Sequence, residues 1–127
     1  MNPRPALLPF LVLAASLAAQ SSAVEITAEP AHHLALQNGY VRVFKVEAPP
    51  HAATLMHRHR HDYVFVTLGA SEVSNEVEGK PPVTLKLPDG ETRFVPGGFA
   101  HIARNLADTP FRNVTIELMQ DEQARKS

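Results

Sequence analysis

Short apolar runs alternate with turn signals over most of the chain beyond residue 38. Gly, Pro, Asn and Asp gather at positions such as Asn38-Gly39 and Pro88-Asp89-Gly90, and they separate segments rich in Val, Thr, Phe and Leu. Eight such segments are predicted to be strands: Tyr40–Glu47, Thr54–His59, Tyr63–Leu68, Glu72–Val77, Val83–Leu87, Thr92–Val95, His101–Leu106 and Arg112–Leu118. No helical period and no internal repeat interrupts them, so the pattern predicts an all-β sandwich or barrel.

The segment Tyr63–Leu68 indicates how such a strand would be buried. Side chains two apart on a strand point to the same side, so Tyr63, Phe65 and Thr67 share one face and the intervening residues share the other. Both faces are largely apolar. This favours a strand with one side in a barrel lumen and the other side against a second layer or a partner subunit.

The first two dozen residues differ in composition from the rest. Arg4 is their only charged residue, residues 7–19 are nearly continuous Leu, Ala, Val and Phe, and Ser21-Ser22-Ala23 places small residues where a signal peptidase cleaves. This predicts a signal peptide over residues 1–23, cleaved after Ala23 or alternatively after Ala19, and a secreted or periplasmic protein. A membrane anchor is disfavoured because the apolar run is shorter than the ~20 residues of a spanning helix.

The rest of the chain has the length of one domain, residues 24–119, followed by a polar tail at residues 120–127. Removing residues 1–23 takes away one basic residue and no acid, which leaves 11 Lys and Arg against 13 Asp and Glu. This balance gives no basic footprint for nucleic acid, so we expect no nucleic-acid partner. The chain has no cysteine, so its core, a metal ion or an oligomer must stabilise it.

Three of the seven histidines alternate along one predicted strand, as His57, His59 and His61. Residues two apart on a strand face the same way, so a pair of imidazoles can meet one ion there, while the intervening arginines face away. Imidazole is a ligand for zinc, copper, nickel and iron. His61 stands beside Asp62, where a turn can begin, so ligation and a solvated or supporting role both stay open for it.

A second pattern lies about forty residues later. Gly90, Pro96, Gly98, His101 and Asn105 follow the spacing G-x5-P-x-G-x2-H-x3-N, which a random sequence matches at a given start on the order of once in several million. The proline ends one strand, the glycine pair permits a tight turn with positive φ, and His101 opens the next strand.

This second pattern matches the second motif of the cupins at every fixed position. Their first motif, G-x5-H-x-H-x3,4-E-x6-G, matches at His57 and His59 only: its opening glycine is His51, its glutamate is Tyr63 (or Val64 at the longer spacing), and its closing glycine is Ala70. From residue 40 to residue 118 the chain resembles a small secreted cupin of the RmlC-like type.

The resemblance implies an antiparallel jelly-roll β-barrel in a single domain, with a metal site inside. It assigns His57, His59 and His101 as ligands of one divalent transition metal ion, which would be iron, zinc, copper, nickel or manganese. It supplies no carboxylate ligand, because Tyr63 stands in that place. Tyr63 is therefore the candidate catalytic residue: it could ligate as phenolate, donate a hydrogen bond to a metal-bound species, or only fill the lumen.

Two classes of function follow from a three-histidine site. The first is a mononuclear metalloenzyme that acts on a small metabolite, with dioxygenase-like cleavage as the leading reaction and isomerisation or hydrolysis as alternatives. The second is a non-catalytic module that binds or senses a metal or a small ligand; a metal-free barrel is a third possibility. Cupins commonly pair through an edge or swapped strand, and an open sheet edge benefits from a cover, so we expect a homodimer.

Other polar residues have simpler interpretations. Three histidines outside the pattern are expected on the surface: His32, His33 and His51. Asn105 is expected to fix a turn or a strand end. Arg93 alternates with Val95 in its strand, so it either binds an anionic substrate or forms a surface salt bridge.

Overall fold

The computed structural model describes residues 1–6, 9 and 22–119 of the chain. The hydrophobic part of the predicted signal peptide and the predicted polar tail lie outside the described residues. Among the residues that are described, no helix is long and apolar enough to cross a membrane.

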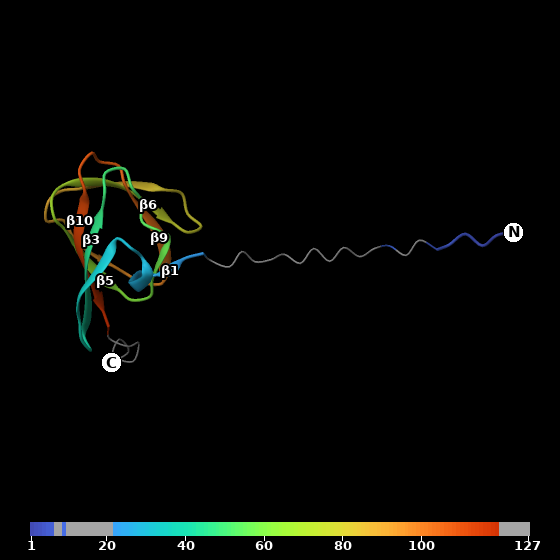
Figure 1. Cartoon of the computed structure of the whole chain (residues 1–127), viewed down its shortest axis with the longest axis horizontal. Coiled ribbons are helices and arrows are strands. Elements are labelled where there is room, and N and C mark those ends of the chain that lie inside the picture. Colours follow the sequence, from blue (N-terminus) through green and yellow to red (C-terminus); the bar gives the residue numbers. More distant parts are fainter. Residues whose placement is uncertain (7–8, 10–21, 120–127) are drawn as a thin grey trace.

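Two five-stranded sheets form the domain (Figure 1). The first has the order β1 (Val24–Glu25), β4 (His57–His59), β9 (Phe99–Asn105), β6 (Ser71–Val77) and β7 (Val83–Leu87). The second has the order β2 (His32–Gln37), β3 (Val41–Ala48), β10 (Phe111–Leu118), β5 (Tyr63–Thr67) and β8 (Thr92–Val95). All pairs are antiparallel except β1 with β4. A short 3-10 helix, η1 (Ile26–Ala28), links β1 to β2. The predicted all-β antiparallel jelly-roll is confirmed.

Each of the eight predicted strands is present, with ends that differ by up to three residues. Strands β1 and β2 were not predicted. The reason is visible in β2, where Leu34 and Leu36 are 53% and 51% exposed, so its apolar residues show no buried alternation. This strand is held by its pairing with β3 rather than by an apolar face of its own.

The core lies between the inner faces of the two sheets. Along β10 every second side chain is buried, from Phe111 to Glu117, as expected of a strand with one face inside. Buried apolar residues form two groups: Ala48, Val73, Leu87 and Phe111 in one, and Ile26, Phe44 and Val46 in the other. Burial of these side chains is the main favourable contribution to folding in a chain without disulfides.

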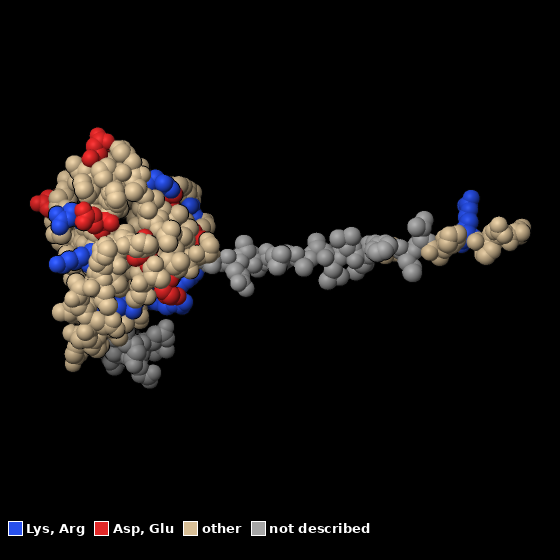
Figure 2. All heavy atoms as spheres, in the orientation of Figure 1, with Lys and Arg blue, Asp and Glu red and all other residues tan. Residues whose placement is uncertain are grey.

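The outer face of the second sheet carries an apolar row. The strand register places Phe94, Val64, Ile116, Val43 and Leu36 in one row that crosses all five strands. Phe94 and Leu36, at the two ends of the row, are 58% and 51% exposed. The two largely apolar faces expected for the strand at residues 63–68 are therefore present. On the face drawn in Figure 2, acidic and basic side chains are interspersed.

The turn at Pro96-Gly97-Gly98 joins β8 to β9, the strand that carries His101. Gly98 has a φ of 95°, which favours glycine, and its N–H donates to the His59 carbonyl at 2.7 Å. Gly97 is required for a different reason: a Cβ there would lie 2.5 Å from the backbone of His61. The predicted tight turn is present, and both glycines are needed to bring β8 and β9 close to the end of β4.

Candidate metal centre

Three imidazoles converge in the interior of the barrel. His57 and His59 lie on β4 with their side chains on one face, and the register places His101 of β9 opposite His57. The three Nε2 atoms form a triangle with sides of 3.1 Å each. His57 and His59 are only 1% and 2% exposed. These three side chains are the predicted ligands. In the part of the chain that the structure describes, they form the group of His, Asp or Glu residues that can hold a metal ion. We call them the histidine triad.

Hydrogen bonds at the other ring nitrogen set the tautomers of two members of the triad. His57 donates from Nδ1 to the Leu55 carbonyl at 2.8 Å, and His101 donates from Nδ1 to Oδ1 of Asn75 at 2.7 Å. Because both oxygens only accept, each Nδ1 carries the proton and each Nε2 presents a lone pair. Nδ1 of His59 is buried and has no partner in the described part of the chain.

The surroundings keep all three imidazoles neutral. Burial, followed by the charges of neighbouring histidines, lowers the pKa of His57 to about 4, that of His101 to about 3 and that of His59 to about 2. A metal binds the neutral form of imidazole. The environment therefore leaves the Nε2 lone pairs of His57 and His101 only 3.1 Å apart, which is unfavourable unless a cation or an N–H donor lies between them.

The triad fits a single transition metal ion. Three nitrogens 3.1 Å apart can share a point about 2.1 Å from each of them, which is an ordinary metal–imidazole distance. Three histidines would supply fewer ligands than the four to six that a divalent transition metal takes, so water or a substrate atom could complete the set.

Tyr63, the candidate catalytic residue, lies next to the triad. Its ring is nearly parallel to that of His59, with centroids 4.2 Å apart, and it lines the same cavity. Burial raises the pKa of Tyr63, and the nearby Glu117 carboxylate raises it further. Both effects favour the protonated phenol when no metal ion is bound, and a protonated phenol can donate a hydrogen bond; the role of Tyr63 stays a prediction.

A solved structure decides the family. The cupin domain from Bordetella pertussis Tohama I is 32% identical to this chain, covers 68% of it and 90% of its own length, and superposes with a TM-score of 0.65. This chain is a cupin. No protein-family model matches the sequence, and no curated protein matches it.

Two more distant structures share the fold of this cupin. An RmlC-like cupin with a double-stranded β-helix fold from Methanocaldococcus jannaschii is 13% identical over 68% of this chain and 77% of its own, with a TM-score of 0.59. A DMSP lyase from Ruegeria pomeroyi DSS-3 is 26% identical over 67% of this chain but only 41% of its own, with a TM-score of 0.51.

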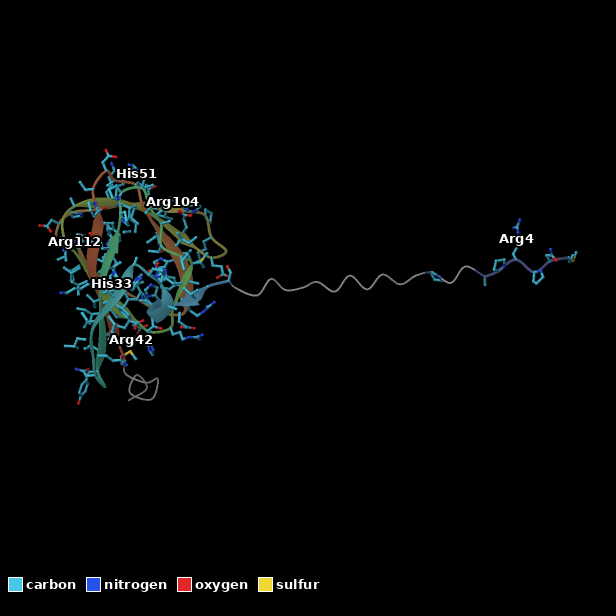
Figure 3. All side chains as sticks on the ribbon, in the orientation of Figure 1. Arg4, His33, Arg42, His51, Arg104 and Arg112 are labelled. Carbon is cyan, nitrogen blue, oxygen red and sulfur yellow. The ribbon has the colours of Figure 1, made fainter. Side chains whose placement is uncertain are left out.

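His61 and His51 lie apart from the triad of this cupin. His61 is half-buried, does not line the cavity and does not join the metal-binding group, so of the three alternating histidines only two converge. His51 is exposed, as expected, and its Nε2 is 2.6 Å from Oδ1 of Asp108. Figure 3 labels it at the surface.

The expectation that His32 lies on the surface was wrong. Its side chain is 5% exposed, it lines the cavity, and its ring centroid is 4.7 Å from that of His57. Its Nδ1 donates to Oε2 of Glu29, a carboxylate that is 2% exposed and also accepts from the backbone N–H groups of Ala31 and Leu55. The spacing Glu-x-x-His is the sequence signal that could have indicated this pair. His33, the next residue, is exposed as expected.

The remaining predicted roles are also visible. Asn105 donates from Nδ2 to the carbonyls of Ala48, Pro49 and Thr109, so it fixes the end of β9 as expected. Arg93 forms the expected salt bridge, in which Nε donates to Oε1 of Glu91 at 2.9 Å, and its side chain also lines the cavity; binding of an anion there stays a prediction. That cavity has a volume of about 240 Å³.

Proposed function

We propose that this cupin binds one divalent transition metal ion, which is iron, zinc, copper, nickel or manganese, through His57, His59 and His101, and that it catalyses a dioxygenase-like reaction on a small metabolite. The observation that carries the proposal is the triangle of neutral Nε2 atoms, 3.1 Å apart, on the wall of a cavity of about 240 Å³. A cavity of this volume accommodates a small molecule rather than a polymer.

A divalent ion with three neutral ligands would supply Lewis acidity, or a redox centre if it is iron, copper or manganese. The other parts of the site belong to the chain. The Leu55 carbonyl and the Asn75 amide hold two imidazoles in the required orientation. Tyr63 lines the cavity beside His59, and in this proposal its phenol O–H donates a hydrogen bond to a substrate oxygen. Phe65 and Phe99 contribute apolar wall that excludes water.

Oxygen uptake with a panel of diketones, catechols and flavonols tests this function. We expect one class to be consumed by the metal-loaded protein, and Tyr63→Phe to lower kcat by about a hundredfold or more because a donor to the transition state is lost. Tyr40→Phe is the matched control, since Tyr40 is the other tyrosine and is 74% exposed. If no member of the panel supports oxygen uptake by fully loaded protein, the dioxygenase proposal fails.

A non-catalytic role as a metal-binding or ligand-sensing module is the second candidate. The burial of His57 and His59 favours it, because an ion held by fully buried side chains stabilises the fold directly. This role predicts a large loss of thermal stability on chelation and no turnover of any substrate. A small anion such as azide distinguishes the two: it perturbs the spectrum of an open metal site and leaves a closed site unchanged.

We also propose that the protein is a homodimer. The support is the apolar row across the outer face of the second sheet, from Phe94 on β8 to Leu36 on β2, which includes both edge strands. Covering it with a second copy would remove exposed apolar side chains and shield the edges. Light scattering after size exclusion is the test: a dimer that Phe94→Asp converts to a monomer is expected, and a monomeric wild type contradicts it.

A further inference from the structure

One charged side chain in the cavity has no part in the metal site. Arg93 lines the cavity together with apolar residues of β5, β7 and β8. We infer that the cavity binds a small carboxylate, with the anionic group held by Arg93 and the rest of the molecule extending toward the histidine triad. This inference rests on the proposed function, because it names the class of substrate for the same site.

The strand register fixes where Arg93 lies relative to the triad. On the paired strands β5 and β8, Val95 is opposite Tyr63 and Arg93 is opposite Phe65. Tyr63 stacks on His59, so Val95, opposite Tyr63, is the residue of β8 nearest the metal site. Arg93 is the next inward-facing residue of β8, two residues farther from the triad. Two residues of strand correspond to about 7 Å. A molecule that spans from the triad to the guanidinium therefore has a body of only a few carbon atoms.

The charge of the cavity wall favours an anion. Among the described residues that line the cavity, Arg93 is the one with a permanent charge, and none of them is an Asp or Glu. An arginine in a concave, largely apolar site attracts an anion more strongly than one in bulk water, because the local dielectric is lower.

Glu91 orients the Arg93 guanidinium by pairing with one of its three nitrogens. The ion pair joins Nε of Arg93 to Oε1 of Glu91 at 2.9 Å, so the two terminal nitrogens are not part of it. Glu91 itself does not line the cavity. A guanidinium fixed in this way can present two parallel N–H donors to a carboxylate, a geometry that gives strong and specific recognition.

The remaining residues that line the cavity would surround the body of the ligand. Phe65, Leu85, Leu87 and Val95 are apolar, whereas Asn113 and Thr115 add a small polar patch. A carboxylate head with a short apolar body matches this division. A neutral hydrocarbon would offer no acceptor to the terminal nitrogens of Arg93, and a polyanion would find a single cation.

Binding of butyrate, compared with its neutral analogue butyramide, tests the inference by calorimetric titration of the full-length protein with and without bound metal. We expect butyrate to bind at least tenfold more tightly than butyramide, and Arg93→Gln to remove that difference. Arg104→Gln is the matched control: Arg104, labelled in Figure 3, forms an ion pair of the same 2.9 Å with Glu76 and has a similar side-chain exposure, 44% against 39%, but does not line the cavity.

Two further variants keep the test decisive if Arg93→Gln folds poorly. Glu91→Gln keeps an oxygen that can accept from Nε but removes the negative charge beside Arg93, so it should tighten butyrate binding several-fold. Arg93→Lys keeps the charge and should weaken binding because the paired donors are lost. Equal binding of butyrate and butyramide, no saturable binding of either, or equal effects of Arg93→Gln and Arg104→Gln would overturn the inference. Metal content measured on the same samples separates this failure from a failure of the metal site.

Discussion

Four histidines line the cavity in the described part of this cupin, and they are held in two different ways. In the triad, His57 and His101 donate to uncharged acceptors, a backbone carbonyl and an amide. His32 donates instead to the buried carboxylate of Glu29. Burial alone would raise the pKa of Glu29, but the hydrogen bond and charge of His32 and the Leu55 N–H together lower it. The two arrangements lie side by side, since the rings of His32 and His57 are 4.7 Å apart.

The neutral acceptors and the carboxylate acceptor have different effects on the imidazoles that they bind. A neutral acceptor fixes the tautomer and orientation of an imidazole without favouring its protonation, which suits a metal ligand. A carboxylate fixes the ring and also stabilises a positive charge on it. Glu29 has a second effect, because it accepts from the N–H of Leu55, whose carbonyl in turn holds His57. The pair therefore supports the triad without belonging to it.

Acidification should have the largest effect on stability, because it protonates the three histidines of the triad. An unfolded histidine titrates near 6.5, whereas the folded values are lowered to about 4, 3 and 2. Below 6.5 the unfolded state then binds more protons than the folded state, so stability falls as the pH falls toward 4. We expect the melting temperature of the metal-free protein to drop steeply over this range by calorimetry. His57→Leu/His101→Leu should flatten the dependence; a melting temperature that is constant from 6.5 to 4 in the wild type would contradict the neutral triad.

Glu29→Gln tests the carboxylate pair and should have the next largest effect. Oε2 of Glu29 accepts from Ala31 N–H and from Nδ1 of His32, and Oε1 accepts from Leu55 N–H; an amide has a single oxygen, so it cannot satisfy donors on both sides. Leaving a buried donor without a partner costs about 2 kcal/mol in the free energy of unfolding, measurable with urea. His33→Gln, on the exposed neighbouring histidine, should change it by less than about 0.5 kcal/mol. Equal effects of the two variants would mean that the buried pair contributes nothing.

Asn75→Leu tests the neutral acceptor of the triad, and we expect its effect on metal affinity rather than on the fold. It keeps the size of the side chain but leaves Nδ1 of His101 without its acceptor. We expect the metal affinity to fall about tenfold to a hundredfold, measured by competition with a chelator, with the fold retained. Asn75→Asp restores an acceptor and should restore the affinity. An unchanged affinity in Asn75→Leu would show that the hydrogen bond does not orient His101.

Much of this site could be predicted from the sequence because its main residues are local. Alternation puts His57 and His59 on one face of a strand, and the cupin resemblance adds His101, which follows a proline and two glycines at the spacing of the second motif. The role of Gly97 was predicted only in part: its value lies in the close approach of the His61 backbone, which depends on a packing partner about forty residues earlier in the chain.

The Glu29–His32 pair and Asn75 could not be placed from the sequence for a related reason. His32 lies on β2 of the second sheet, yet it meets His57 on β4 of the first sheet. Asn75 reaches His101 because β6 pairs with β9, a contact between residues 26 apart. Such contacts depend on sheet order and on which face points inward. A short strand with exposed leucines, such as β2, gives little indication of either.

Metal content is the most direct test of the central claim, that His57, His59 and His101 hold one metal ion. The protein should be purified without a histidine tag and analysed for iron, zinc, copper, nickel and manganese, beside His57→Ala/His101→Ala and a control with the exposed pair changed, His33→Ala/His51→Ala. We predict one metal ion per chain in the wild type and in the control, and none in the triad variant. A wild type that holds no metal after reconstitution, or a triad variant that holds as much as the wild type, would contradict the account.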